Sequence, residues 1–111
     1  MKKVGREVLF LATGQDNPRN GEGAMIRRRD GSILLIYTAY YGDDWNDHCS
    51  ANLSAYVSYD EGETWDGPHI AVKKDEQAQN IMSVSLLRMN NGDIGLFYIR
   101  KGMVNGMGLD E

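Results

Sequence analysis

The stretch "SYDEGETW", residues 58–65, contains the side chains that a tight hairpin tip needs. Aspartates in turns accept hydrogen bonds from amides one to several residues further on, so Asp60 can close the turn on its own backbone. Gly62 supplies a position of positive φ without steric cost. Trp65, just past the turn, can fold its indole beneath the tip. We therefore interpret the stretch as a structural turn rather than a catalytic site.

Short apolar segments lie on both sides of this turn and recur along the chain between turn signals. They are rich in β-branched and aromatic residues, they often alternate with polar ones, and none has a convincing helical period. This pattern predicts an all-β fold built from hairpins. The expected strands are residues 7–12, 24–29, 33–39, 52–58, 70–73, 84–89 and 94–100.

Two of the expected hairpins resemble each other. Residues 26–37 have the sequence "IRRRDGSILLIY" and residues 87–98 have "LRMNNGDIGLFY", each with a turn pair, Asp-Gly or Asn-Gly, between apolar runs. One constant offset, which carries Ile26 onto Leu87 and Tyr37 onto Tyr98, aligns their Arg, Gly, Ile, Leu and Tyr positions. A repeat at this spacing is typical of a radial array of small sheets, and its alternative is coincidence between two common hairpin patterns.

Composition excludes several classes of protein. The chain has 111 residues, of which 41% are hydrophobic and 25% charged, as in ordinary globular domains. Its formal charge of −4 argues against nonspecific nucleic-acid binding, which needs a basic face. No apolar run is long enough to span a bilayer, and the apolar core at residues 8–12 is shorter than that of a signal peptide. No localisation follows from these features.

The sequence offers little for a disulfide or a metal site. Cys49 is the single cysteine, and His48 and His69 lack the spacing of zinc ligands. An acidic cluster could suggest calcium, but no EF-hand-like loop surrounds its members Asp43, Asp44 and Asp47. We predict neither a metal nor a cofactor.

The hairpin tip resembles the Asp-box, or bacterial neuraminidase repeat, of the sialidase superfamily. The matching positions of this motif are Ser58, Asp60, Gly62, Thr64 and Trp65. "NPRNGEGAMIRRRDGSILLIYT" (residues 17–38) and "MSVSLLRMNNGDIGLFYIRK" (residues 82–101) are also similar to the first blades of bacterial sialidase-like proteins. The resemblance covers nearly the whole chain. Because Asp-boxes recur in other propeller proteins, it speaks for the fold more strongly than for an activity.

The resemblance implies a six-bladed β-propeller with antiparallel four-stranded blades and Asp-boxes between third and fourth strands. The first blade would span about residues 24–74, with its box at 58–65, and the second would start at about residues 82–101. Residues 7–12 would be an outer strand that closes a blade from the far end of the sequence. About two blades would then be present.

The resemblance also implies hydrolytic removal of a terminal sialic acid or a related sugar. Sialidases use a tyrosine nucleophile paired with a glutamate, and three arginines hold the substrate carboxylate because a planar guanidinium donates to both oxygens. Arg19 occupies the place of the first arginine, although "NGE" follows it instead of the family's usual residues. Glu22 could orient Arg19 or face water. A solvated loop arginine is the alternative interpretation.

The acid/base aspartate of the family lies in the loop before the Asp-box, here "YYGDDWNDHCSAN", residues 40–52. We prefer Asp47, and we expect partial burial beside Trp45 to raise its pKa so that it can donate a proton. His48 is a rival because its ordinary pKa lies near neutrality. The alternative is a loop of solvated acids. Among the residues that begin the second blade, packing is expected for Met82 and sugar binding is a weak expectation for Ser83.

The remaining candidates are assigned structural roles. The basic residues 27–29 are expected on solvated faces or over aromatic neighbours, and the tyrosines of the expected strands are interpreted as strand aromatics. The nucleophile pair and the other two arginines belong to late blades in the resembling family and have no match here.

Three interpretations of the whole chain follow. We expect the N-terminal part of a sialidase-like glycoside hydrolase that is inactive alone. The alternatives are a carbohydrate-binding module assembled into a ring from several copies, and a freestanding sheet protein that keeps the box as a turn. The expected partner is a glycan, with no nucleic acid and no membrane, and open sheet edges would favour self-association.

Overall fold

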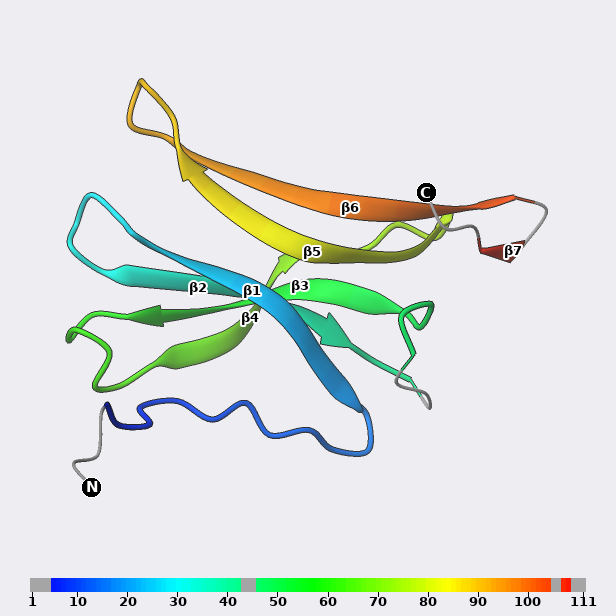
Figure 1. Cartoon of the computed structure of the whole chain (residues 1–111), viewed down its shortest axis with the longest axis horizontal. Helices are drawn as coiled ribbons and strands as arrows, with labels where there is room; N and C mark the ends of the chain where they lie inside the picture. The colour runs from blue at the N-terminus through cyan, green and yellow to red at the C-terminus, as the bar shows by residue number, and fades with distance from the viewer. Residues whose placement is uncertain (1–4, 43–45, 105–106, 109–111) are drawn as a thin grey trace.

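The computed structural model describes residues 5–42, 46–104 and 107–108 of the chain (Figure 1). The described residues are all-β and contain no helix, so none of them forms a helix that could cross a membrane. The strands are β1 (Arg19–Arg27), β2 (Ile33–Tyr40), β3 (Ala51–Ser58), β4 (Asp66–Val72), β5 (Ala78–Arg88), β6 (Ile94–Val104) and β7 (Met107–Gly108).

The first sheet is a four-stranded antiparallel meander in which β1, β2, β3 and β4 pair in chain order. The pairing of β2 with β3 is unbroken from Ile33 opposite Ser58 to Tyr40 opposite Ala51. β2 and β3 are the interior strands, and their apolar residues are accordingly the best buried of this sheet.

The second sheet is antiparallel in the order β5, β6, β7, with β7 pairing only with the end of β6. The register of β5 against β6 shifts between Met82 and Ser85. Ser83, inside this bulge, has a φ of 62°, which is uncommon for a residue other than glycine.

The pairing registers show that the two sheets contain the same hairpin. Met25 lies opposite Leu35 in the first sheet, and Leu86 lies opposite Leu96 in the second, at the offset found in the sequence. The match continues past the bulges, where Arg19 opposite Tyr40 corresponds to Asn80 opposite Lys101. The repeat predicted from residues 26–37 and 87–98 is therefore confirmed in the backbone pairing.

The turns of the two hairpins also correspond. Gly31 and Gly92 have φ values of 87° and 91°, as turns of this kind require. In the first turn the amide of Gly31 donates to the carbonyl of Arg28, and in the second the amide of Gly92 donates to that of Met89. The same offset relates these two contacts, so the sequence similarity reflects matching turn geometry.

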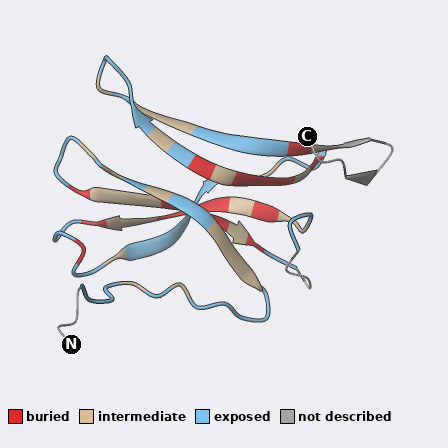
Figure 2. Ribbon diagram, viewed as in Figure 1, coloured by how far each residue is buried: buried red, intermediate tan, exposed pale blue. Residues whose placement is uncertain are grey.

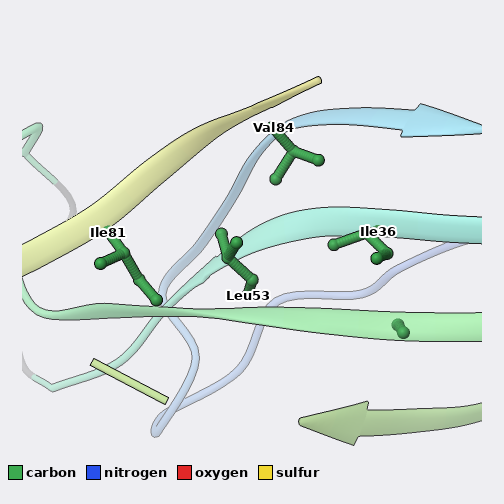
Figure 3. Close-up of a cluster of buried hydrophobic side chains, with 5 residues drawn as sticks. Ile36, Leu53, Ile81 and Val84 are labelled. Atoms are coloured by element: carbon green, nitrogen blue, oxygen red, sulfur yellow. The ribbon is translucent and has the colours of Figure 1, made fainter. Parts of the chain in front are cut away.

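The hydrophobic core lies between the sheets. Its buried members are Ile36, Leu53 and Ala55 from the first sheet and Ile81 and Val84 from the second, and Figure 3 shows the cluster. β5 packs against β1, β2 and β3, whereas residues 97–100 in the middle of β6 are exposed (Figure 2). The inner strand of the second sheet is therefore the one that holds the two sheets together.

One expected strand is wrong. Residues 7–12 form no ladder with either sheet. Their side chains alternate between exposed Val8 and Phe10 and half-buried Leu9 and Leu11, and Leu9 and Leu11 line a hollow with Met25 of the first sheet. The apolar run that suggested a strand is explained by this position, because the segment covers an apolar sheet face with its side chains.

Several strand boundaries also differ from the prediction. β1 begins at Arg19 rather than residue 24, β4 at Asp66 rather than residue 70, and β5 at Ala78 rather than residue 84. The residues added to β1 and β4 are polar or glycine-containing, so their composition gives little strand signal, but neighbouring strands supply backbone partners. The residues added to β5 mix polar Gln79 and Asn80 with buried Ile81 and Met82.

Candidate functional site

The five residues that resemble an Asp-box form one closed network at the hairpin between β3 and β4, which we call the Asp-box turn. The buried hydroxyl of Ser58 accepts from the Gly62 amide at 2.8 Å and donates to the Asp60 carboxylate at 2.9 Å. That carboxylate also accepts from the Thr64 amide at 2.8 Å and the Thr64 hydroxyl at 2.5 Å. The indole of Trp65 donates to the Gly62 carbonyl at 3.0 Å. The polar groups of the motif are therefore engaged with each other.

Hydrogen bonds from Thr64 lower the pKa of Asp60 below its ordinary value. A carboxyl group held ionised by its own turn is a poor proton donor at neutral pH. The chemistry of the Asp-box thus suits a turn and does not suit acid catalysis.

A second polar cluster lies at the start of β1. The guanidinium of Arg19 pairs with the carboxylate of Asp47, with Nη1 and Oδ1 2.5 Å apart. Arg19 lies opposite Tyr40 in the β1–β2 ladder, and its guanidinium lies over the Tyr40 ring, 4.8 Å from the centroid. Two residues that the sequence suggested separately, 28 positions apart, are therefore in direct contact.

Contacts from the second sheet fix the backbone of Asp47. Its backbone carbonyl accepts from the Asn80 side-chain amide at 2.8 Å and from the Lys101 ammonium at 3.0 Å. The Asn80 amide also donates to the Cys49 carbonyl at 2.9 Å. Asn80 is fully buried and Lys101 nearly so, which gives the loop a rigid anchor in the second sheet. The Asp47 carboxylate can point outward while its backbone is held.

The start of β1 is fixed in a similar way. The side-chain amide of Asn17 donates to the carbonyl of Tyr40 at 2.7 Å and to that of Arg19 at 3.1 Å. Asn17 thereby ties the start of β1 to the end of its partner β2. Arg19 consequently emerges from a braced backbone rather than from a free loop.

The electrostatics of Asp47 differ from the expectation. The hydrogen bond from Arg19 lowers the pKa of the Asp47 carboxyl below its ordinary 3.8, and its side chain is 61% exposed. The expectation that burial raises this pKa is therefore wrong for this arrangement. Trp45, the residue expected to bury it, lies outside the described residues, as do Asp43 and Asp44. Asp47 is a carboxylate at neutral pH.

Two other expected site residues lie on the same segments as this pair, His48 in the loop of Asp47 and Glu22 on the strand of Arg19. His48 is exposed in the same loop, where its backbone amide donates to the Asn46 side chain at 2.7 Å. Glu22 is exposed on β1. The hydrogen bond to Asp47 is the main cause that raises the pKa of Arg19, and burial is the main cause that raises the pKa of Tyr40; the charge of Glu22 adds a smaller effect to both.

Ser83 approaches the cluster from the second sheet through its backbone. Its amide donates to the hydroxyl of the buried Thr38 at 3.2 Å, and that hydroxyl donates to the carbonyl of Glu22 at 3.2 Å. Thr38 thus joins the bulges of β1 and β5. Glu22 and Ser83 are brought near each other by this shared contact.

Sequence reasoning misses the residues that support the pair. It assigns Tyr40 only the role of a strand aromatic, and it gives no role to Asn80 or Lys101. The repeat contains a signal for both, because Asn80 and Lys101 hold the positions equivalent to Arg19 and Tyr40. All four residues stand at the same end of the two hairpins.

The arginines 27–29 lie at the other end of β1, away from this cluster. Arg27 pairs with Glu61, Arg28 donates to Ser32, and Arg29 donates to the Asn91 carbonyl. No group of three or more metal-binding side chains occurs within the described part of the chain.

A shallow hollow of about 420 Å³ adjoins the cluster on the outer face of the first sheet. Tyr40 and Asn17 belong to both features, and Tyr37, Tyr41 and Lys73 are among the other lining residues. Aromatic faces with a few polar groups suit a ligand of mixed polarity, such as a sugar.

Fold and site together define an all-β protein of antiparallel sheets, with an arginine–aspartate pair braced at one end of a repeated hairpin. No protein-family model matches the chain, and no curated protein is significantly similar to it.

Proposed function

We propose that this chain forms part of a sialidase-like, carbohydrate-active β-propeller in which Arg19 binds the carboxylate of a terminal sialic acid or a related acidic sugar. The contact between Arg19 and Asp47 carries the proposal. In this ion pair the guanidinium already holds a carboxylate by a short, charge-assisted hydrogen bond.

The surroundings of Arg19 support a binding role. Its side chain is 32% exposed, so a ligand can reach it, while the Tyr40 ring beneath it restricts its orientation. A guanidinium that is held in place loses less conformational entropy when it binds an anion. This distinguishes Arg19 from an arginine that extends freely into water.

Asp47 and a substrate carboxylate would compete for the same guanidinium. When the sugar carboxylate replaces Asp47 at Arg19, the hydrogen bond that lowers the Asp47 pKa is lost and that pKa rises. Binding would thereby bring Asp47 closer to the protonated form that an acid catalyst needs. The acid/base role of Asp47 is thus proposed only for the ligand-bound state.

The propeller assignment rests on two features. The two sheets repeat the same hairpin register, and the Asp-box joins β3 to β4, which is its place in the resembling family. Repeated antiparallel sheets that pack face to face are the building plan of a propeller.

We expect the chain to bind the sugar without hydrolysing it, because the tyrosine–glutamate pair and two further arginines have no match in its sequence. The second candidate function is a carbohydrate-binding propeller module without catalysis. The ionised state of Asp47 favours this alternative, since an ionised Asp47 cannot donate a proton in the absence of ligand.

The experiment compares binding of N-acetylneuraminic acid and of its methyl ester by ligand-observed NMR. Arg19→Lys keeps the charge but loses the planar fork, and Arg27→Lys is the matched control. Arg27 is also paired with a carboxylate, that of Glu61, and it stands at the far end of β1, roughly 25 Å away.

We expect the acid to bind the wild type and Arg27→Lys equally, with a loss of binding in Arg19→Lys and for the ester. Equal binding of acid and ester, or no effect of Arg19→Lys, would refute the assignment. Release of a fluorogenic aglycone from a sialoside by the chain alone would contradict the expected lack of hydrolysis and exclude the non-catalytic module.

A further inference from the structure

The two sheets contact each other through unlike faces. We call the side of the first sheet that carries Ala24 and Ile36 its back face, because it meets the second sheet. The side of the second sheet that carries Leu86 and Leu96 is its front face, because it meets the first. The contact within the chain is therefore a back face against a front face.

The repeat identifies the same two faces on the other sheet. Its constant offset makes Ser85 and Phe97 the back face of the second sheet, because they correspond to Ala24 and Ile36. Met25 and Leu35 form the front face of the first sheet, because they correspond to Leu86 and Leu96. The chain thus carries one unoccupied back face and one front face turned away from the core.

Burial differs sharply between equivalent back-face positions. Ile36 is 6% exposed, whereas its counterpart Phe97 is 51% exposed. Thr38 is fully buried, whereas its counterpart Ile99 is 44% exposed. Figure 2 shows this stretch of β6 as an exposed band. Apolar side chains whose counterparts are buried indicate a contact surface rather than scattered surface residues.

The front face of the first sheet is also incompletely covered. Met25 is 64% exposed, and residues 8–11 cross this side and share two shallow hollows with Met25 and Trp65. The covering segment makes no ladder with the sheet. It can therefore be displaced without breaking strand pairing.

We propose that a second copy of this chain docks head to tail, with the front face of its first sheet on the back face of this chain's second sheet. Met25 and Leu35 of one copy would lie on Phe97 and Ile99 of the other, as Leu86 and Leu96 lie on the first sheet within the chain. The contact is heterologous, so the docked pair still carries one free front face and one free back face. The inference does not depend on sugar binding.

A polar contact supports the same geometry. Within the chain, Arg88 donates to the carbonyl of Arg27, its counterpart in the preceding sheet. Arg27 holds the equivalent place in the first sheet, and its side chain is 53% exposed. In the docked pair, Arg27 of one copy would reach the Arg88 carbonyl of the other.

Sedimentation velocity tests this contact with one variant for each face. Phe97→Glu places a charge on the back face only, and Met25→Glu places one on the front face only. Tyr59→Glu is the control, because Tyr59 is 69% exposed on the Asp-box turn and belongs to neither face. Far-ultraviolet circular dichroism establishes that each variant keeps its β-sheet content.

We expect the wild type and Tyr59→Glu to associate as concentration rises, and each single-face variant to remain monomeric. An equimolar mixture of Phe97→Glu and Met25→Glu should form a dimer and nothing larger, since only one good front and one good back face remain. A monomeric wild type, dimers of either single variant alone, or variants that associate like the wild type would overturn the proposal. If a variant loses its sheet content, Phe97→Ser or Met25→Ser replaces it.

Discussion

Arg88 donates a hydrogen bond to the backbone carbonyl of Arg27, the residue that has the same place in the preceding sheet. Each arginine also donates to the carbonyl of its own turn, Arg27 to Gly31 and Arg88 to Gly92. An arginine at the same position therefore closes the turn of each hairpin. The arginine of the second sheet, Arg88, also contacts the first sheet.

The paired turns predict a paired response to substitution. Gly31→Ala and Gly92→Ala both force an alanine into the left-handed region, which should destabilise each variant by about 1 kcal/mol. At Gly31 an added Cβ meets open space, whereas at Gly92 it meets the flexible guanidinium of Arg29. We expect urea denaturation to give a slightly larger loss for Gly92→Ala. A neutral effect at either position would contradict the equivalence of the turns.

Removal of the Ser58 hydroxyl should destabilise the Asp-box turn. Ser58→Ala leaves the Gly62 amide without the oxygen that accepts its hydrogen bond, at a cost of about 1–3 kcal/mol. Ser85→Ala, on an exposed position of β5, is the matched control and should be nearly neutral. Thermal unfolding of both variants at low protein concentration measures the difference. Equal stability of the two would show that the network does not hold the turn.

Asp75, in the segment between the sheets, has a pKa that depends on its ion pair with Arg100. Arg100 donates to both oxygens of Asp75, each at 2.8 Å, and lowers the Asp75 pKa to about 2 from an ordinary 3.8. The folded pKa is the lower one, so the stabilisation is present above pH 3.8 and is lost as pH falls toward 2. We expect the Asp75 pKa, measured by NMR titration, to return toward 3.8 in Arg100→Gln but not in the control Arg29→Gln. An unchanged Asp75 pKa in Arg100→Gln would contradict the pairing.

If Asp47 and an acidic ligand compete for Arg19, removal of Asp47 should strengthen ligand binding rather than weaken it. Asp47→Ala removes the internal competitor for Arg19, so binding of N-acetylneuraminic acid should tighten by about two- to fivefold, as expected for an exposed pair. Glu61→Ala, which releases Arg27 instead, should leave binding unchanged. Ligand-observed NMR gives both affinities. Weaker binding in Asp47→Ala would mean that Asp47 contacts the sugar directly rather than competing with it.

Much of the fold could be predicted because the strands of the two repeated hairpins carry apolar residues at strand spacing. The hairpin of β1 and β2 and its repeat in β5 and β6 are visible from Asp-Gly and Asn-Gly turns and from the constant offset between them. The start of β1 is missed because Arg19 begins a polar, glycine-containing segment. The start of β5 is missed because Gln79 and Asn80 interrupt the apolar pattern before the buried Ile81. Residues 7–12 mislead because a short apolar run on a covering segment looks like a short apolar strand.

Of the candidate site, only the charged pair Arg19 and Asp47 could be predicted from the sequence. Arg19 and Asp47 are suggested by residue type and position, but their contact depends on loop closure over 28 residues. The direction in which the Asp47 pKa shifts could not be inferred from the sequence. Burial raises the pKa of a carboxyl group and a guanidinium partner lowers it, and only the structure shows that Arg19 is the stronger influence. Asn80 and Lys101 donate hydrogen bonds to the backbone carbonyl of Asp47, and no sequence motif predicts such contacts to the backbone.

The central claim is that Arg19 holds Asp47 in the free protein and exchanges it for a sugar carboxylate. The most direct measurement is the pH titration of the Asp47 carboxyl carbon by NMR, with and without saturating N-acetylneuraminic acid. We predict a midpoint below 3.8 without ligand and a higher midpoint with it. A midpoint that does not move, or that moves equally in Arg19→Lys, would contradict the account.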